Sequence, residues 1–482
     1  MAQQAPVRNV AAPPVTLGVI IGNRDFFPDV LVGEARKDLV KLFEAAGIRS
    51  IMLTPEQTKL GGVETYGDAR QCADLFKQHR DAIDGVLVCL PNFGDEKGVA
   101  DTLKMAGLNV PVLVQGYPDD LNALGVARRR DAFCGKISVC NNLKQARIPF
   151  TLTQKHVVHP TDETFKQDLA KFVAVCRTVK KLRKARFGAV GARPGAFNTV
   201  RYSEKILESY GISVTTVDLS EILGKAGKLD GGDQRVQEKL AAINDYAPSV
   251  GVPHDKMLQM SRLGVVLDEF IEANALDSTA IQCWTSLQQN WGCNVCTCMS
   301  MMSEKLMPSA CEVDITGALS MYALSLASQM PSALVDWNNN YGGDPDKCVL
   351  FHCGNWPKAF APDTKIANAP ILGSTLGVEN TYGAMEGRTP AGPLTYARFT
   401  TDDTAGVVRG YVGEGTTTDD QLETFGHRAV AQIPGLQNLL HYICDNGFEH
   451  HVAVNPSLTG EVIAEACGKY LGWEMHTHVK KG

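Results

Sequence analysis

The sequence lacks the features that mark membrane, exported and nucleic-acid-binding proteins. No stretch approaches the ~18 uninterrupted apolar residues of a membrane helix. The first residues, Met-Ala-Gln-Gln-Ala-Pro, contain no basic region followed by an apolar block, so we expect no secretory signal. The 482 residues include 47 basic and 53 acidic side chains, a formal net charge of -6. Because binding to a phosphate backbone needs a basic field, this balance argues against nucleic acid as a main partner.

The sequence also lacks the glycine-rich motifs of nucleotide-binding loops. Neither Gly-x-Gly-x-x-Gly after a strand nor Gly-Lys-Ser/Thr occurs where strands are expected to end. Two of these strand ends instead carry an arginine, Arg24 in Gly-Asn-Arg and Arg193 in Gly-Ala-Arg-Pro-Gly. Small molecules bind at the carboxyl ends of parallel strands, so both arginines are candidates to bind an anionic or polyhydroxy ligand. The alternative is that each is an ordinary surface arginine.

Cysteine, by contrast, is plentiful. Fourteen cysteines without an export signal indicate free thiols in a reducing compartment, and we expect the cytoplasm. Three of them form the motif Cys293-x-x-Cys296-x-Cys298. A structural zinc site normally needs a fourth ligand and a second paired element, so we favour buried thiols on a helix. A zinc or iron–sulfur centre is the alternative interpretation.

The hydrophobic pattern predicts an α/β protein with two Rossmann-like αβα domains, each with a parallel sheet, followed by a β-rich, barrel-like C-terminal domain. Short apolar strands alternate with amphipathic helices from residue 15 to 115, a rhythm typical of parallel strands covered on both faces. A second such series follows a basic helix predicted over 172–186. After about residue 330, short β-rich pieces separated by Gly, Pro, Asn and Asp suit an antiparallel sheet or barrel. The predicted divisions are a flexible tail at 1–14 and domains at 15–165, 166–325 and 326–482.

Two acidic residues follow apolar segments at the end of the second series. Glu312 lies in Pro-Ser-Ala-Cys-Glu-Val-Asp-Ile, and Asp336 ends the apolar segment 332–335. A carboxylate at such a position is costly to bury unless it is paired or coordinates a cation. Two such carboxylates can share one cation, and His450, where a late strand is expected to begin, would be the third ligand. Capping or surface acids are the alternative.

These stretches resemble the ligand-bearing region of the L-fucose and L-arabinose isomerases. The similarity lies in the segment from Glu312 to Asp336, in Val-Leu-Phe-His352-Cys-Gly-Asn and in Glu-His450-His451-Val. In that family a glutamate, an aspartate and a late histidine hold a divalent cation, usually manganese. The resemblance assigns these roles to Glu312, Asp336 and His450, with the adjacent His451 as the alternative.

The resemblance implies further roles. Gln282 and Trp284 would line the sugar site with an amide and an aromatic ring. His352 would contact the substrate or serve as a hydrogen-bonded core histidine. The cation would be Mn²⁺, or else Mg²⁺ or Co²⁺. The family assembles as trimers or hexamers, in which Arg24 would act across a subunit interface.

The activity that follows is aldose–ketose isomerisation through a cis-enediol. Two carboxylates exchange the roles of base and acid while the cation stabilises the enediolate oxygens. The substrate would be a pentose, a 6-deoxyhexose or a 6-substituted hexose. Sulfoquinovose, a 6-sulfo sugar, is an alternative because Arg24, Arg193 or Lys136 would pair with a sulfonate. A non-catalytic sugar-binding protein is the rival class.

Overall fold

The computed structural model describes residues 14–478, so the predicted tail lies outside the described residues except for Pro14. The described residues divide into two compact units, one ending at Lys180 and one beginning at Lys181. Helix α5 (Glu163–Leu182) runs across the first predicted boundary. Its side chains Phe165, Leu169 and Phe172 pack into the core of the first unit, which explains why that unit extends through most of the helix. The three-domain division itself stays a prediction.

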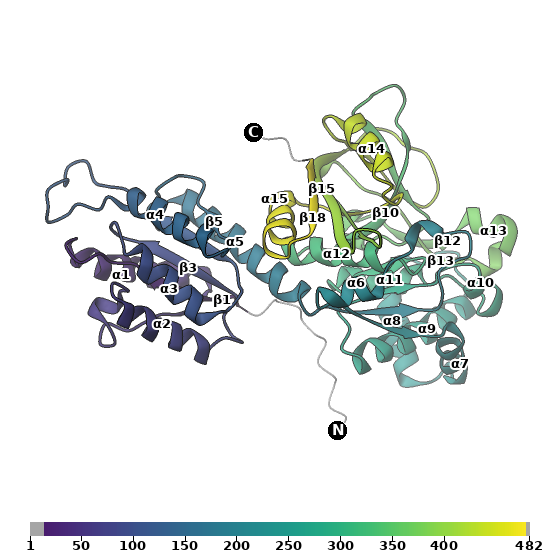
Figure 1. The fold of residues 1–482 in the computed structure, drawn as a ribbon. Coiled ribbons are helices and arrows are strands. Elements are labelled where there is room, and N and C mark those ends of the chain that lie inside the picture. The colour runs from purple at the N-terminus through teal and green to yellow at the C-terminus, as the bar shows by residue number, and fades with distance from the viewer. Residues whose placement is uncertain (1–13, 479–482) are drawn as a thin grey trace. The chain divides into compact units, whose positions relative to one another are not determined.

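The first unit contains a parallel five-stranded sheet in the order β2-β1-β3-β4-β5, as the alternating pattern predicted. Both faces are covered, α1 and α5 packing on one and α2, α3 and α4 on the other (Figure 1). This is why β1 and β3 are buried at every residue. The elements are β1 (Thr16–Ile21), α1 (Val30–Ala46), β2 (Arg49–Ile51), α2 (Tyr66–Gln78), β3 (Gly85–Leu90), α3 (Glu96–Ala106), β4 (Val112–Gly116), α4 (Ala132–Gln145) and β5 (Thr151–Leu152).

The second unit begins with a parallel four-stranded sheet in the order β7-β6-β8-β9. The basic helix predicted over 172–186 is the C-terminal part of α5, which starts earlier and ends at Leu182. The elements are β6 (Arg186–Val190), α6 (Glu204–Ser209), β7 (Ser213–Val217), α7 (Leu219–Lys228), α8 (Gln234–Tyr246), α9 (His254–Ala273), β8 (Ser278–Ile281), α10 (Ser286–Asn290), α11 (Cys296–Glu304) and β9 (Ser309–Cys311).

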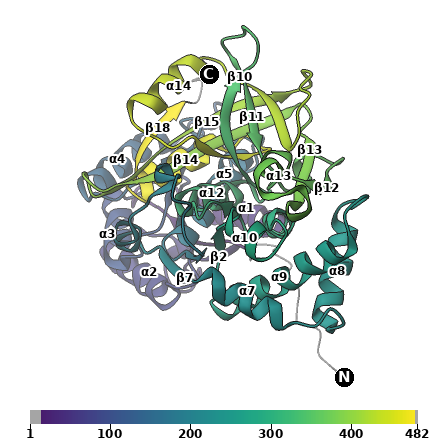
Figure 2. The same cartoon turned by 90° about the vertical axis from the view of Figure 1, so that its right-hand side faces the viewer.

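The β-rich part is a mixed nine-stranded sheet in the order β12-β13-β16-β11-β10-β17-β14-β15-β18, and Figure 2 shows β10 and β11 side by side. Strand β15 also pairs with β16, and a pairing of this kind is what a closed barrel would need. The barrel-like form of this domain stays a prediction. The strands are β10 (Ala333–Asn340), β11 (Lys347–His352), β12 (Lys365–Asn368), β13 (Tyr382–Arg388), β14 (Gly392–Asp402), β15 (Val407–Thr418), β16 (His427–Gln432), β17 (His451–Asn455) and β18 (Glu474–His478).

Helix α12 (Ile315–Ser328) joins the two sheets of the second unit. It packs against β8 and β9 of the parallel sheet and against β14 and β17 of the mixed sheet, and nearly all its residues are buried. The other α-helices of the described residues are α13 (Pro370–Leu376), α14 (Leu436–Asp445) and α15 (Gly460–Ile463), which continues into the π-helix η5 (Ala464–Tyr470). Four short 3-10 helices lie at η1 (Lys59–Gly61), η2 (Asn198–Val200), η3 (Lys358–Phe360) and η4 (Val378–Asn380). None of the helices between residues 14 and 478 is both long and apolar enough to cross a membrane.

Candidate active site

The chain turns sharply between β9 and α12, and Glu312 lies in this turn. Glu312 and Val313 have φ angles of 55° and 57°, in the left-handed region that side chains rarely adopt. Such conformations cost on the order of 1–3 kcal/mol each and persist where the surrounding structure holds them. Here Asp314 caps α12 by accepting a hydrogen bond from the Gly317 amide at 2.8 Å. The strained turn therefore fixes the place where the Glu312 side chain enters the site.

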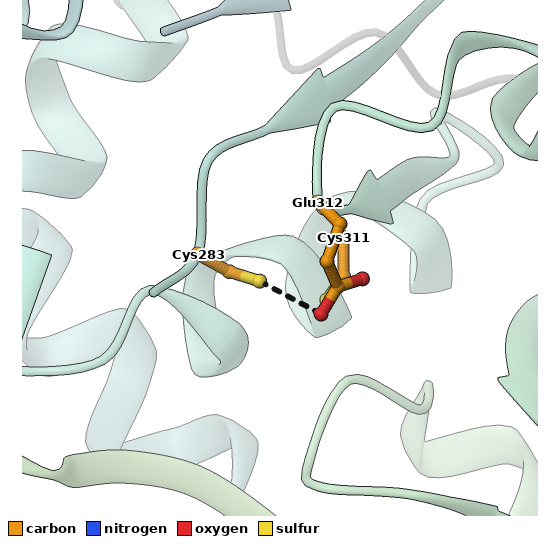
Figure 3. Close-up of side chains that lie close together, drawn as sticks. All are labelled: Cys283, Cys311 and Glu312. Carbon is orange, nitrogen blue, oxygen red and sulfur yellow. Dashed lines mark hydrogen bonds between the residues drawn. The ribbon is translucent and has the colours of Figure 1, made fainter. Parts of the chain in front are cut away.

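The two carboxylate oxygens of Glu312 have different surroundings. Oε1 accepts a hydrogen bond from Trp284 Nε1 at 2.8 Å. It also accepts one from the Cys283 thiol at 3.4 Å, which Figure 3 shows. Oε2 is buried and has no hydrogen-bond partner. It faces Nε2 of His451 at 3.7 Å and Nε2 of His352 at 3.8 Å. A buried carboxylate oxygen without a donor is costly, so this atom fits a ligand position for a cation.

Strand pairing brings the other site residues together. Strand β10 lies between β11 and β17, and Asp336 is directly opposite His451 in the antiparallel pair. Residues opposite each other project to the same face of a sheet. Asp336 Oδ1 accordingly lies 3.6 Å from His451 Nε2, and it is 3.7 Å from Nε2 of His450.

Two groups of ligand atoms result, and His451 belongs to both. Glu312, His352 and His451 form one, Asp336, His450 and His451 the other, with the atoms of each within 4.8 Å of one another. Separations of 3.6–3.8 Å are too long for hydrogen bonds. They match the ~3.6 Å between ligands that each lie ~2.1 Å from a cation at an angle of about 120°. The donor set therefore fits a divalent cation.

A buried network of charged side chains contacts the His451 ring at Nδ1, the nitrogen that does not face the site. Its Nδ1 lies 2.9 Å from Asp314 Oδ2, a contact that orients Nε2 toward the site. Asp314 also accepts two hydrogen bonds from Arg398, at 2.6 and 3.0 Å, and Arg398 Nε donates to Glu449 Oε2 at 3.1 Å. Arg398 and Asp314 are completely inaccessible to solvent. The pair thus holds the imidazole in place without reaching the site itself.

The carboxyl groups of Glu312 and Asp314 are both held in the charged form. Burial raises the pKa of Glu312, but the nearby His352 and His451 imidazoles and the hydrogen bond from Trp284 outweigh it and lower the pKa to about 2. Burial likewise raises the pKa of Asp314, and the Arg398 guanidinium and His451 together bring it well below its usual range. Ionised carboxylates are the form that binds a cation.

The remaining predicted residues of the second unit lie in the segments that follow β6 and β8. Gln282 lines a cavity of about 890 Å³ at the carboxyl ends of β6, β7 and β8, and its Oε1 accepts a hydrogen bond from the Ala192 amide at 2.9 Å. The Phe197 ring packs edge-on against Trp284 and His450, with centroids 5.3 and 5.5 Å away. Arg193 lies in the same loop, where its Nη1 donates to the Pro194 carbonyl. Among the described residues, Arg193 has no carboxylate partner.

Two predicted anion-binding residues already have partners within the first unit. Arg24 forms an ion pair with Glu96, donates to the Gly94 carbonyl at 2.9 Å and stacks on the Phe93 ring. Lys136 on α4 is buried, and its Nζ donates to Thr153 Oγ1 at 2.6 Å and to the His156 carbonyl at 3.0 Å. The charged groups of Arg24 and Lys136 therefore both bind partners inside this unit.

Lys136 gives a pH-dependent contribution to stability. Burial lowers its pKa from 10.5 to about 8, a cost of about 3 kcal/mol while the amine is charged. Between pH 8 and 10.5 the unfolded chain keeps the proton that the folded chain has lost. The destabilising effect of Lys136 therefore becomes smaller, and the stability of the folded chain rises, as the pH rises through this range. Lys136→Met should unfold at a higher temperature than wild type at pH 7, and calorimetry should show this difference shrinking above pH 8. The exposed Lys97→Met is the control, and a constant difference would contradict the assignment.

The motif Cys293-x-x-Cys296-x-Cys298 does not converge on one point. Cys293 and Cys298 lie in different hydrophobic clusters. Within residues 14–478, no group of three metal-ligating side chains contains either of them. This favours buried thiols over a zinc or iron–sulfur centre at the motif.

Comparison with known families identifies the chain. Residues 18–183 match the N-terminal domain of fucose/sulfoquinovose isomerases, and residues 350–478 match the C-terminal domain of L-fucose isomerase. The chain belongs to the fucose isomerase family. It is therefore an aldose–ketose isomerase, which excludes the rival interpretation of a non-catalytic sugar-binding protein. Glu312 and Asp336 lie outside both matched ranges, so their roles depend on the geometry above.

Individual curated relatives are similar to nearly the whole length of this chain. Proteins named sulfoquinovose isomerase from Priestia aryabhattai and Priestia megaterium are each 24% identical over 480 residues, covering 96% of this chain and 99% of the relative. One from Alkalicoccus urumqiensis is 24% identical over 308 residues, covering 63% of this chain and 68% of the relative. The similarity thus includes the segment between the two matched domains.

Proposed function

We propose that this fucose isomerase homologue is a divalent-cation-dependent isomerase of a 6-sulfo aldohexose of the sulfoquinovose type. The observation that carries the metal dependence is the buried Oε2 of Glu312, which has no hydrogen-bond donor and faces two imidazole nitrogens. Glu312, Asp336 and His451 are the proposed ligands, with His352 beside them. His451 replaces His450 in this proposal because its Nε2 is near both acids. Oxygen and imidazole ligands suit Mn²⁺, with Mg²⁺ or Co²⁺ as alternatives.

The proposed reaction moves one proton between neighbouring carbons. One of the two carboxylates, Glu312 or Asp336, would remove the proton from C2 of the aldose, and the other, in its protonated form, would give a proton to C1. The hydroxyl proton of O2 would pass to O1 in the same interconversion. The two carboxylates exchange these roles in the reverse direction. Trp284 and Cys283 hold Oε1 of Glu312, which keeps Oε2 directed into the site. The bound cation supplies charge stabilisation for the enediolate oxygens.

The sulfonate preference is supported by the names of the curated relatives and by Arg193. This arginine lies in the loop whose Phe197 packs on Trp284, and its guanidinium has no acidic partner among the described residues. A guanidinium pairs well with the three oxygens of a sulfonate. Assembly into a trimer or hexamer and location in the cytoplasm stay predictions that follow from the resemblance and the composition.

The substrate is tested with Mn²⁺ and a panel of sulfoquinovose, L-fucose, L-arabinose and D-arabinose, followed by NMR. We expect the highest kcat/KM for sulfoquinovose. Arg193→Ala should lower that value roughly 10- to 100-fold, the range for losing a hydrogen bond to a charged group, while leaving the 6-deoxy sugar unaffected. Arg201→Ala, in the same segment, is the control. A preference for L-fucose, or an unchanged ratio in Arg193→Ala, would refute the sulfonate assignment.

A further inference from the structure

Thiol groups surround the other side of the Glu312 carboxylate. Cys283, Cys311 and Glu312 each offer one ligand atom, and these atoms lie within 4.8 Å of one another. All three side chains are buried. Figure 3 shows the Cys283 thiol directed at the carboxylate, with Cys311 next to Glu312 in the chain.

The register of the parallel sheet produces this cluster. Cys311 is the last residue of β9 and is paired with Ile281, the last residue of β8. Cys283 follows two residues after Ile281 and therefore lies beside the turn that carries Glu312. The two sulfur ligands thus come from separate segments, and neither belongs to the motif of Cys293, Cys296 and Cys298.

We propose that Cys283, Cys311 and the Glu312 carboxylate form a second cation site, selective for soft divalent ions such as zinc and cadmium. Thiolates select such ions, whereas the imidazole and carboxylate groups facing Oε2 suit harder ones. The two sites share Glu312 but use different sides of its carboxylate.

The geometry needs little adjustment for a soft ion. Sulfur atoms that each lie ~2.3 Å from a tetrahedral zinc are ~3.8 Å apart. The ligand atoms are already within 4.8 Å, so side-chain rotations suffice. Each thiol releases its proton to solvent when the ion binds, and Cys283 then no longer donates to Oε1.

The shared carboxylate links the two sites. An ion on the thiol side neutralises part of the charge of Glu312 and removes a donor that holds Oε1. Binding of Mn²⁺ on the histidine side should then weaken, so cadmium should inhibit isomerisation. This competition depends on the proposed function, whereas the binding of cadmium does not.

The test is a cadmium titration of the whole reduced chain, with exposed Cys134 and Cys444 changed to Ser in every variant. The readout is the ultraviolet thiolate-to-cadmium charge-transfer band. We expect one strongly bound ion per chain, with affinity falling at least about tenfold in Cys283→Ser and in Cys311→Ser, because a hydroxyl is a far poorer ligand for a soft ion. Cys348→Ser, which changes a buried thiol of β11 outside the cluster, should leave the titration unchanged. Two substitutions keep the test decisive if one variant fails to fold.

Absence of the band, or equal affinity in all three variants, would overturn the second site. His451→Gln separates this result from the proposed function, because it should weaken Mn²⁺ binding, followed by electron paramagnetic resonance, and leave the cadmium band intact. Loss of the cadmium band in His451→Gln would mean that the thiols do not form an independent site. A wild-type chain that binds cadmium but no Mn²⁺ would refute the proposed function alone.

Discussion

Glu312→Gln should fold normally and lose isomerase turnover by two to four orders of magnitude. The amide oxygen can still accept the Trp284 hydrogen bond, so the turn after β9 should keep its conformation. The amide, however, is neutral, and it can neither take a proton from the sugar nor bind a cation as a carboxylate does. The measurement is kcat at saturating sugar and Mn²⁺, together with the dissociation constant for Mn²⁺.

Glu386→Gln is the matched control, because Glu386 lies on β13, where it pairs with Lys365. Near-wild-type turnover in Glu312→Gln would refute the assigned role. The same Mn²⁺ titration separates the two neighbouring histidines. His451→Gln should weaken binding more than His450→Gln, since only His451 contacts both acids. The opposite order would restore His450 as the ligand.

Arg398→Met should destabilise the second unit by about 3–5 kcal/mol, the usual cost of removing one member of a buried ion pair. Methionine fills much of the space but leaves Asp314 and Glu449 buried without the positive charge that pairs with them. Urea denaturation of the whole chain, followed by tryptophan fluorescence, measures the loss. The free energy should be compared within one transition, because a chain of two units need not unfold in a single step.

Lys347→Met is the control for Arg398→Met. Lys347 on β11 pairs with Asp420 at 2.7 Å but is partly exposed, so its loss should cost much less than the loss of Arg398. Adding Glu449→Gln to Arg398→Met should recover part of the stability, since one of the two orphaned charges is removed. Equal effects of Arg398→Met and Lys347→Met would show that the buried network contributes no more than a surface pair.

Some residues of the candidate site could be recognised from the sequence pattern, and others could not. Glu312 and Asp336 stood out because a carboxylate in an apolar segment needs a partner or a cation. Asp314 carried the same signal two residues later. Arg398 did not, because a single arginine in a short β-rich piece is normally placed on the solvent face. The sequence around Phe197 and Cys283 also gave no sign of a role in the site. Only their contacts in the folded chain place them there.

The sequence by itself determined the two parallel αβ layers and the β-rich C-terminal part, and it singled out the two acids as candidates. These follow from local apolar periodicity and from the cost of burying charge. Only the tertiary structure decided that His451, opposite Asp336, lies between both acids, and that Asp314, Arg398 and Glu449 support it. The reason is strand register: a shift of one residue turns every side chain to the other face of a sheet. That register joins segments more than a hundred residues apart, and no local pattern encodes it.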